Sequence, residues 1–458
     1  MLDIVNRLIK EVGEDKVATG QEVLTQYSHD FWPLLLMKIR YFKEELPKPI
    51  AVVYPEDVND VVKVIKILRE YKTAKLVVYG GGSSVTGASA PMGNAVVLDM
   101  RRMRKILDFN EYDLMVTVET GIYLRDLEAE LNKRGFSIRH IPQSFNYATI
   151  GGLIATMSSG QFSTLYGNIE DIVINMEVVL PSGEVTWLRR NNAPRSSTGP
   201  SLKYLFIGSE GMLGVITKAV LRVVPTPTSV RYGAFIFPSF KQGIEALREL
   251  MLRRLIPAVA RLYDEQESRI RFSIDGSLLI ISFEGYDDEL TSVIWNKAIT
   301  VVKGHGGNYV GEEPYERWLS TRFNVEEEIS LIEKLGLWFD TIEISSPWSR
   351  LYELYRDIRD STLNINGVFS IMAHVSHLYI NGACVYFTVI FKPSEEVYWR
   401  IWDNIMRITI NGGGSISHHH GIGILRSKWL VEELGKGLNV LKEIKNALDA
   451  HGLFRNLD

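Results

Sequence analysis

Residues 79–87 read Tyr-Gly-Gly-Gly-Ser-Ser-Val-Thr-Gly and close the apolar run Leu76–Tyr79, which predicts a buried strand. The glycines let the backbone approach a ligand closely and turn N–H groups toward an anion, and the hydroxyls add donors. No Gly-Lys-Ser/Thr ends the loop, so it is not a P-loop. The following Ala88-Ser89-Ala90-Pro91 cannot open the helix that a Rossmann fingerprint requires. Taken alone, the loop is equally compatible with a tight turn.

Further loops of small residues lie downstream of this segment. They are Pro142-Gln143-Ser144, Thr149-Ile150-Gly151-Gly152, Ser197-Thr198-Gly199-Pro200 and Gly208-Ser209-Glu210-Gly211-Met212-Leu213-Gly214-Val215-Ile216. Glycine-rich loops spread over about 140 residues suit a long ligand laid across many backbone N–H groups, with a diphosphate at its middle.

The secondary-structure pattern changes at Pro225-Thr226-Pro227-Thr228. Before it, the periodicity predicts helices over 57–71 and 122–134 and a hairpin around Pro181-Ser182-Gly183. After it, the order strand, helix, strand, strand, helix runs over 230–303 and a similar order follows from 339 to 409. Two such α+β halves suggest one shared antiparallel sheet.

Composition excludes several classes of protein. A length of 458 residues predicts two to three domains, and a net charge of −4 shows no basic excess for nucleic acid. The lone Cys384 excludes a disulfide framework, a cysteine zinc site and an iron–sulfur cluster. No apolar run approaches the ~18 residues of a membrane span, the start lacks the pattern of a secretory signal, and the end carries no peroxisomal address. We therefore expect a cytoplasmic enzyme.

The order and spacing of these loops resemble the FAD-binding oxidases of the vanillyl-alcohol-oxidase (PCMH) type over nearly the whole chain. The resemblance implies a two-subdomain FAD-binding domain at 1–225, an α+β cap with a large antiparallel sheet at 226–404, and a C-terminal segment, 405–458, that returns to the FAD domain. It implies that the cofactor contacts are Gly80, Gly81, Gly82, Ser83, Ser84, Gly87, Pro142, Ser144, Thr149, Gly151, Gly152, Glu210, Gly214 and Ile216. Some relatives attach flavin through a histidine beside the loop. Since the nearest ones here are His29 and His140, we predict non-covalent FAD.

Three adjacent histidines, His418-His419-His420, stand between glycine turns. Imidazole exchanges protons near neutral pH and also binds metals, so the bare motif is compatible with acid/base catalysis, with metal ligation or with a surface loop. Within the flavin family the cluster resembles the alkyl-dihydroxyacetone-phosphate synthase branch, as do Arg261-Leu262-Tyr263-Asp264, Ser345-Ser346-Pro347-Trp348 and Gly382-Ala383-Cys384-Val385-Tyr386-Phe387.

That resemblance implies acid/base roles for Tyr386, His418, His419 and His420, and a role for Arg261 in ordering the flavin site. The implied reaction replaces the acyl group of acyl-dihydroxyacetone phosphate by a fatty alcohol through a flavin N5 adduct, in ether-lipid synthesis. From the residues alone, Tyr386 is equally compatible with core packing on a strand. Arg261 is likewise compatible with an ion pair to Asp264 or Glu284.

Two other functions stay open. A FAD-dependent D-2-hydroxyacid dehydrogenase of the D-lactate or glycolate type would use a histidine as base. Many such enzymes hold a divalent metal with two histidines and a glutamate. Here His374 fits the first position, but Tyr386 and His419 replace the others, so we predict no metal. A flavin-binding protein without catalytic turnover is the third hypothesis for the function.

The sequence departs from the synthase branch at the arginine that is thought to hold substrate phosphate, where Ile329 or a neighbour stands. Arg322, Arg350 and Lys303 are candidate replacements, and His374 is a further substrate-site candidate. On a regular strand His374 and His377 would point to opposite faces, so we do not expect them to share a site.

The expected partner is a small-molecule or lipid substrate. The helix over 244–255 carries Arg248, Arg253 and Arg254 beside leucines, which leaves a peripheral membrane contact open, although a solvated face over the cap core is favoured. A homodimer also stays open.

Overall fold

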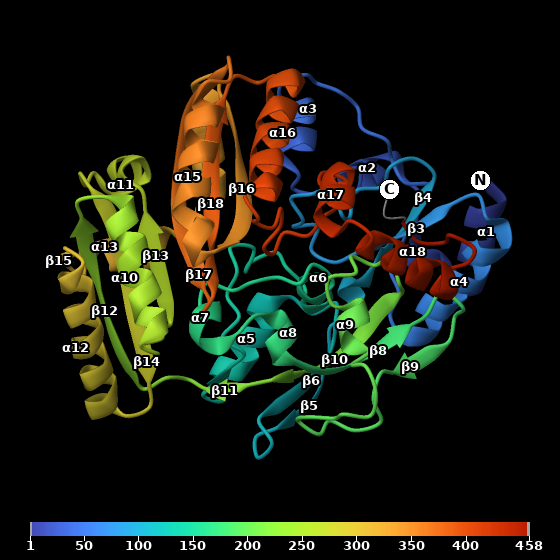
Figure 1. Ribbon diagram of the computed structural model, residues 1–458. Helices are drawn as coiled ribbons and strands as arrows, with labels where there is room; N and C mark the ends of the chain where they lie inside the picture. The colour runs from blue at the N-terminus through green and yellow to red at the C-terminus, as the bar shows by residue number, and fades with distance from the viewer. Residues whose placement is uncertain (1, 456–458) are drawn as a thin grey trace.

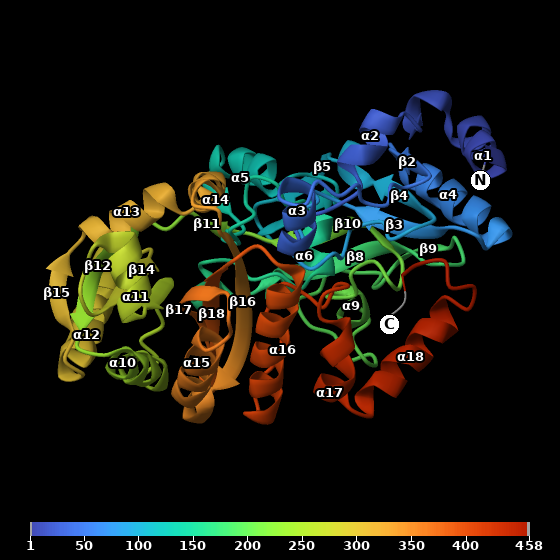
Figure 2. The ribbon, with the colours of Figure 1, turned by 90° about the horizontal axis from the view of Figure 1, so that it is seen from above.

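The computed structural model describes residues 2–455, without the side chains of Val325 and Glu328 (Figure 1). Mixed helices and sheets form the molecule, as the sequence predicted for an α+β protein. The first unit contains two sheets, and a seven-stranded antiparallel sheet forms the cap. In the view from above, the cap and the first unit lie side by side, and the first and last helices of the chain lie on the first unit (Figure 2).

A four-stranded sheet, in the order β1-β2-β4-β3, supports the glycine-rich loop. Its strands are β1 (Val17–Ala18), β2 (Ala51–Val53), β3 (Lys75–Tyr79) and β4 (Ala95–Asp99). The helices around it are α1 (Leu2–Val12), α2 (Gln21–Gln26), α3 (Pro33–Arg40) and α4 (Val58–Tyr71), with short turns η1 (Glu14–Lys16) and η2 (Met100–Arg102). Helix α4 begins where the Asp57 carboxylate accepts the N–H groups of Asn59 and Asp60. The glycine loop leaves the carboxyl end of β3.

A five-stranded antiparallel sheet, in the order β5-β6-β10-β8-β9, completes the first unit. Its strands are β5 (Ile106–Asn110), β6 (Met115–Glu119), β8 (Val173–Val179), β9 (Val185–Trp187) and β10 (Val215–Arg222), and β7 (Phe136–Ser137) pairs separately with β11 (Val224–Pro225). The helices are α5 (Leu124–Asn132), α6 (Ile150–Ala155), α7 (Ser163–Tyr166), α8 (Ile169–Ile172) and α9 (Lys203–Phe206). The pairing of β8 with β9 confirms the predicted hairpin.

The cap sheet runs in the order β15-β12-β14-β13-β17-β18-β16 and consists of two similar halves. The first half holds β12 (Ser229–Phe237), α10 (Phe240–Leu252), β13 (Val259–Tyr263), α11 (Glu265–Phe272), β14 (Ser277–Gly285), α12 (Asp288–Gly304) and β15 (Asn308–Gly311). After α13 (Glu313–Thr321) and α14 (Val325–Lys334), the second half holds β16 (Trp338–Pro347), α15 (Trp348–Leu363), β17 (Val368–Leu378), β18 (Gly382–Phe391) and α16 (Glu395–Asn411). The halves join where β13 pairs with β17, which confirms the shared sheet expected from the repeated order.

The two faces of the cap sheet differ in chemistry because side chains alternate along each strand. On β18, Val385 and Phe387 belong to the large apolar core, which also contains Leu351 of α15 and Ile405 of α16. The residues between them, including Tyr386, point to the opposite face. That face carries the polar residues of the candidate site.

The C-terminal residues return to the first unit. After η3 (Ser427–Trp429) and α17 (Leu430–Leu434), helix α18 (Gly437–Leu448) donates a hydrogen bond from the Lys445 ammonium to the carbonyl of Met212, at 2.8 Å. Phe454 then forms a parallel bridge with Leu76 of β3.

Helix α10 packs Leu247, Leu250 and Met251 into the cap core, and Arg253 pairs with Glu249 on its exposed side. This arrangement is the solvated face that the sequence favoured for these arginines. Among the described residues, none of the helices is both long and apolar enough to span a bilayer.

Candidate active site

The Gly80–Ser84 loop meets the start of α6, so two predicted cofactor segments lie together. A Cβ at Gly80 would collide with the Thr149 hydroxyl, and one at Gly81 with the Tyr147 carbonyl. Gly82 has a φ of 66°, in the region that favours glycine. A side chain is therefore excluded at each of these three glycines, by the neighbouring residues or by the backbone conformation.

The same loop presents free donors. Within residues 2–455, no backbone N–H group from Gly80 to Ser84 donates a hydrogen bond to the protein. The Ser84 hydroxyl is held in place by accepting the N–H of Thr86 at 3.2 Å. A row of unpaired N–H groups against a glycine backbone is an anion-binding concavity, which fits a diphosphate.

The remaining predicted cofactor residues border this concavity or support it. Thr149 caps α6 by accepting the N–H of Gly152, and the N–H of Gly151 donates to the Thr120 carbonyl at 2.8 Å. The Glu210 carboxylate is fully engaged within the protein, because it accepts the N–H of Gly423 at 3.0 Å and pairs with Arg455. It thereby fastens the segment after the histidines to the first unit. The others in this set are Gly87, where a Cβ would collide with the Trp32 ring, and Pro142, Ser144, Gly214 and Ile216, which lie in the neighbouring loops and at the start of β10.

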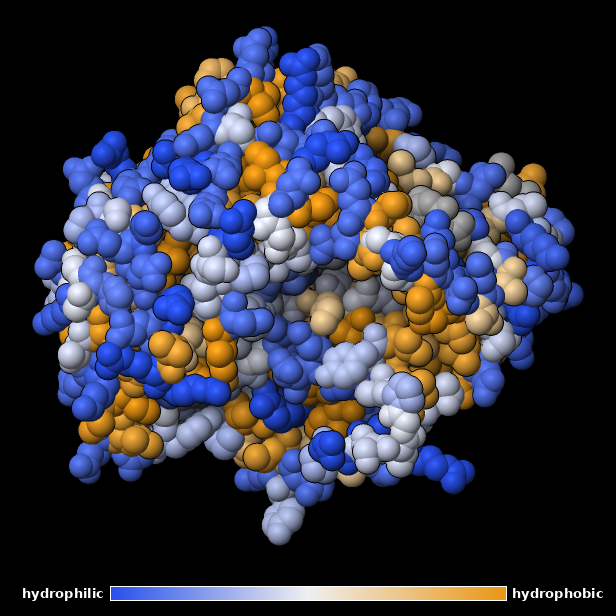
Figure 3. Space-filling model, viewed as in Figure 1, coloured by the Kyte–Doolittle hydropathy of each residue, from blue (hydrophilic) through white to orange (hydrophobic). Residues whose placement is uncertain are grey.

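Facing this concavity, four adjacent cap strands align polar residues in register. Tyr263 of β13 lies opposite His374 of β17, His374 opposite Tyr386 of β18, and Tyr386 opposite Glu343 of β16. The His374 and Tyr386 rings stack at 5.1 Å between centroids. This row crosses the joint between the two halves of the cap. Figure 3 shows the face of the molecule hollowed near its middle, between the cap and the first unit.

The three histidines complete a continuous chain of contacts with this row. Tyr379 Oη lies 2.7 Å from His418 Nε2, and His418 Nδ1 lies 2.7 Å from His419 Nδ1. Tyr386 Oη lies 2.7 Å from His419 Nε2 and 2.8 Å from His420 Nε2. His420 Nδ1 lies 2.9 Å from a carboxylate oxygen of Glu343. We call these six residues the proton relay.

Glu343 fixes the direction of the proton relay. Its carboxylate is fully buried, pairs with the fully buried Arg426, and accepts the N–H groups of His418, His419 and His420 at 3.0 to 3.3 Å. Burial alone would raise the pKa of Glu343, but Arg426 and His420 hold that pKa well below its usual value. The carboxylate is therefore ionised and can only accept.

Each ring tautomer follows from that charge. A lone pair on His420 Nδ1 would repel the carboxylate, so Nδ1 carries the proton and Nε2 accepts from the Tyr386 hydroxyl. His419 then donates from Nε2 to Tyr386 and accepts at Nδ1 from His418. His418 Nε2 in turn accepts from Tyr379. In this arrangement protons can pass along the chain one bond at a time.

Burial keeps these groups uncharged. It lowers the pKa of His418 to about 4 and that of His419 well below its usual value. Burial, reinforced by the Glu343 charge, raises the pKa of Tyr386 well above its usual value. A neutral tyrosine that contacts the neutral imidazole of His419 can give and take a proton with little change in charge.

His377 shows where the strand geometry expected from the sequence was wrong. It belongs to β17, but the pairing of β17 with β18 is irregular between Ser376 and Leu378, and His377 has a φ of 53°. This bulge turns its ring back toward the histidines, with centroids 5.1 Å from those of His418 and His419. His374 and His377 therefore border one site.

Comparison with known proteins agrees with the geometry of the loop and the cap. A family model described as "FAD binding domain" matches residues 49–189, and "FAD linked oxidases, C-terminal domain" matches residues 226–456, half of the chain. The chain belongs to the FAD-linked oxidases. Its cofactor is FAD, and the row of N–H groups at Gly80–Ser84 without a protein acceptor fits the diphosphate of that molecule.

The proteins that this chain is similar to are named as different enzymes. Alkyldihydroxyacetonephosphate synthase of Dictyostelium discoideum is 30% identical over 88% of this chain and 71% of its own length. An FAD-linked oxidoreductase of Escherichia coli (strain K12) is 33% identical over 98% and 96%. The mitochondrial D-lactate dehydrogenase (cytochrome) of Arabidopsis thaliana is 28% identical over 90% and 73%. A solved alkyldihydroxyacetonephosphate synthase structure, 26% identical, aligns with a TM-score of 0.84 over 99% of this chain and 85% of its own.

In this FAD-linked oxidase, Arg261 lies at the site rather than in either ion pair considered from the sequence. Its Nη2 lies 2.7 Å from His374 Nε2, and its Nε donates to the Tyr263 hydroxyl. Glu284 pairs with Arg139 instead, and Asp264 caps α11. Because Arg261 must donate, His374 accepts at Nε2 and directs its Nδ1 proton to Glu267, 3.0 Å away.

The single cysteine, Cys384, lies close to the histidines. Its sulfur and one ring nitrogen each of His418 and His419 lie within 4.8 Å of one another. Burial, with the Glu343 charge, raises the pKa of the Cys384 thiol well above its usual value, whereas a metal needs a thiolate. The ring nitrogens are also engaged in the proton relay. The donor set therefore fits proton transfer better than metal binding.

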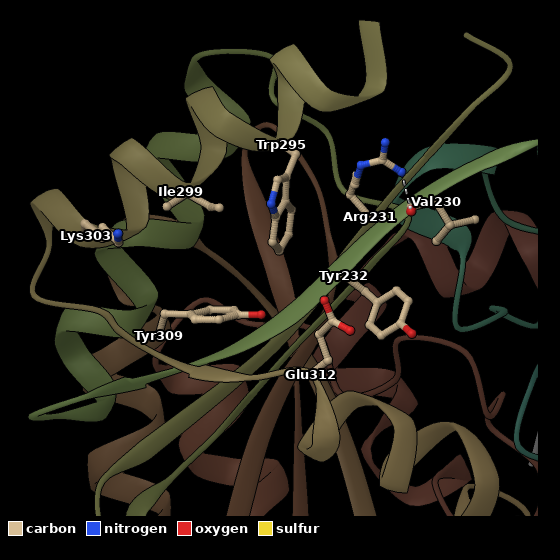
Figure 4. Close-up of a pocket in the computed structure, with 8 residues that line it drawn as sticks. All are labelled: Val230, Arg231, Tyr232, Trp295, Ile299, Lys303, Tyr309 and Glu312. Atoms are coloured by element: carbon tan, nitrogen blue, oxygen red, sulfur yellow. Dashed lines mark hydrogen bonds between the residues drawn. The ribbon is translucent and has the colours of Figure 1, made fainter. Parts of the chain in front are cut away.

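Of the candidate phosphate residues, the structure brings only Arg322 toward the site. Arg350 pairs with Glu353 at 2.5 Å on the exposed side of α15, which covers the opposite face of the sheet. Lys303 lines a cavity of about 470 Å³ between α12, β12 and β15, together with Trp295 and Tyr309 (Figure 4). This cavity is therefore separate from the site, because three strand spacings, or about 14 Å, lie between β12 and the strand β17 that carries His374.

Sequence reasoning missed Glu343, Arg426 and Tyr379. A single acid within the apolar run Ile342-Glu343-Ile344 was the available signal, because a carboxylate in a buried strand must have a partner. Arg426 and Tyr379 carry no comparable signal, since only the fold brings them to the histidines.

Proposed function

We propose that this FAD-linked oxidase catalyses the exchange of alkyldihydroxyacetonephosphate synthase: a fatty alcohol replaces the acyl group of acyl-dihydroxyacetone phosphate, a step of ether-lipid synthesis. The observation that carries the proposal is the Tyr386 hydroxyl, held at 2.7 and 2.8 Å between His419 and His420 with Glu343 behind His420. This exchange needs a base for a substrate C–H proton and an acid for the leaving carboxylate. It is redox-neutral overall.

The group formed by Tyr386, His420 and Glu343 can act as that base. A substrate proton moves to the Tyr386 oxygen while the tyrosine passes its own proton to His420 Nε2. The resulting imidazolium lies 2.9 Å from the Glu343 carboxylate, which stabilises the positive charge. FAD, when bound, supplies a flavin nitrogen that can bond to a substrate carbon or accept a hydride.

The same group can then act as the acid. His420 returns its proton to Tyr386, and Tyr386 delivers it to the departing carboxylate, so the residues end in their starting state. His419, which donates to the Tyr386 oxygen, limits the negative charge on that oxygen during both transfers. Arg261 orients His374, which stacks on the Tyr386 ring and restricts its position.

The alternative is a D-2-hydroxyacid dehydrogenase, in which Tyr386 and His420 would take the proton of the substrate hydroxyl. The similarity to a D-lactate dehydrogenase favours this alternative. A metal-assisted version is disfavoured, because His419 stands where such an enzyme would have a metal-binding glutamate. Both functions use the same base and differ in whether the flavin becomes reduced.

The flavin spectrum under anaerobic conditions separates the two. The FAD-loaded protein is mixed with D-lactate or glycolate, and separately with acyl-dihydroxyacetone phosphate and a labelled fatty alcohol. We expect oxidised flavin with the hydroxy acids and transfer of label into an alkyl ether with the second mixture. Bleaching by a hydroxy acid, without label transfer, would replace the synthase proposal by the dehydrogenase. Neither bleaching nor transfer would favour a flavin-binding role alone.

A further inference from the structure

A second polar centre lies beside the site, at the end of α13. Arg322 caps this helix, and its guanidinium lies over the rings of Phe162, Trp318 and Phe323, 4.9 to 6.0 Å from their centroids. Trp318 has Arg261 at 5.9 Å as well, so one indole lies between the two arginines. Arg322 therefore borders the same site as His374.

The first unit closes over this arginine. The Phe145 and Phe323 rings stack at 5.5 Å across the joint with the cap, and the Gln143 side chain donates to the Arg322 carbonyl. Ser163, next to Phe162, lies 2.8 Å from His377. The guanidinium is thus enclosed between α13 and the loop before α7, within two side chains of the histidines.

This guanidinium has no counter-charge. Nε and Nη1 of Arg322 are buried and have no hydrogen-bond partner, and no ion pair joins Arg322 to a carboxylate in the described part of the chain. Its one charged neighbour is Arg139, a like charge that is already paired with Glu284. Burial lowers the pKa of Arg322. The side-chain oxygen of nearby Gln161 is also buried and unpartnered.

The fully buried Arg426 pairs with Glu343, and the largely buried Arg139 pairs with Glu284. An enclosed charge without a partner is costly, and contacts with aromatic faces offset only part of that cost. The balancing anion at Arg322 is therefore expected from a ligand.

We propose that Arg322 binds the anionic head group of the substrate, a phosphate monoester or a carboxylate. The inference rests on the proposed function in that the ligand must reach the proton relay from this anchor. It assigns the anion to a position seven residues before Ile329, where the chain lacks the arginine expected for that role. The unpartnered Nε and Nη1 lie on different edges of the planar guanidinium, so each can donate to an oxygen of either group.

Binding of small anions to the FAD-loaded protein tests this assignment. The probes are dihydroxyacetone phosphate, its neutral analogue dihydroxyacetone, and D-lactate, each followed by the change in flavin absorbance. The variant Arg322→Met keeps the length of the side chain and removes the charge. Arg317→Met, on the exposed side of the same helix, is the matched control.

We expect Arg322→Met to weaken binding of one anionic probe by about 10- to 100-fold and to leave binding of dihydroxyacetone unchanged. Loss confined to dihydroxyacetone phosphate identifies a phosphate, and loss confined to D-lactate identifies a carboxylate. Unchanged anion binding, an equal loss in Arg317→Met, or no binding of either anion to the wild-type protein would overturn the proposal.

Stability gives a readout that a merely structural arginine would not produce. Since an unpaired buried charge destabilises the unliganded fold, Arg322→Met should melt at the same temperature as the wild type or higher. A marked fall in melting temperature would show that Arg322 stabilises the fold and would contradict the assignment. The variant Tyr386→Phe separates this inference from the proposed function, because it should lower kcat by about 10²- to 10⁴-fold while anion binding persists.

Discussion

The free energy of unfolding of variants at Glu343 and Arg426 tests whether Glu343 is an ionised, buried acceptor. Both side chains are fully buried, and the Glu343 carboxylate also accepts the three N–H groups of His418–His420. Glu343→Gln leaves the Arg426 charge without compensation, which costs about 3–5 kcal/mol of unfolding free energy. Arg426→Met leaves the opposite charge, with a similar cost.

The double variant leaves no lone charge. If the two losses were independent, they would add to about 6–10 kcal/mol, whereas removal of both charges should cost about 2–5 kcal/mol. The midpoints of these ranges, about 8 and about 3.5 kcal/mol, give a coupling energy of about 4 kcal/mol. Denaturation of the FAD-loaded protein by urea at pH 7, in wild type, both single variants and the double variant, measures it.

An exposed pair on α16 provides the control. Glu396 and Arg400 lie four residues apart, with side chains 70% and 59% exposed, so the corresponding cycle should give less than about 1 kcal/mol. Additive losses for Glu343→Gln and Arg426→Met, or a coupling as small as that of the control, would refute the claim that Glu343 is an ionised, buried acceptor. The tautomers assigned to the proton relay would then lose their basis.

Three further predictions concern the relay and the loop. Tyr386→Phe should lower kcat by about 10²- to 10⁴-fold with FAD still bound, whereas Tyr379→Phe, at the far end of the relay, should lower it less; equal losses in steady-state assays would contradict the order of the relay. Since burial lowers the pKa of His418 to about 4, this ring should stay neutral through pH 6.5 and take up a proton only toward pH 4, which the NMR shifts of its imidazole would show. The same shift removes stability as pH falls below about 6.5, because the unfolded chain takes up a proton that the folded one refuses. Gly81→Ala should release FAD, because its Cβ would collide with the Tyr147 carbonyl, whereas Gly20→Ala meets nothing within 4 Å; retention of FAD in both, by absorbance after gel filtration, would refute the loop assignment.

The sequence predicted much of the fold because its signals were local. The helix at 57–71 has an Asp cap and apolar spacing, and the hairpin around Pro181-Ser182-Gly183 has its own turn residues, so each could be recognised without the rest of the chain. The cap sheet was also predicted, since its two halves repeat the same order of elements. Helix α13 was not predicted, because polar residues interrupt its apolar face and its apolar side, Tyr315 and Trp318, is short.

The site was harder to predict because its geometry depends on long-range register. Tyr386 and His420 could be identified as chemically capable residues, but their contact arises only when the segment after α16 folds back under β18. The bulge at His377 reverses the direction that strand alternation assigns to that ring. Glu343 meets Tyr386 only through the pairing of β16 with β18.

The position of the relay at the joint between the two halves of the cap has a physical reason. One face of the seven-stranded sheet is buried under its helices. At the joint, β13 and β17 pair over only two residues, so side chains from both halves of the cap meet there on the other face. Arg261 and Glu267 of the first half determine which nitrogen of His374 carries the proton. Glu343 of the second half, through His420, determines the direction in which the Tyr386 hydroxyl donates. Each half thus fixes one of two stacked rings.

A change that loosens the joint, such as Glu267→Gln, should free His374 to rotate and broaden the pH profile of kcat while the Tyr386–His420 contact remains. An unchanged profile in that variant would show that the second half alone suffices for proton transfer.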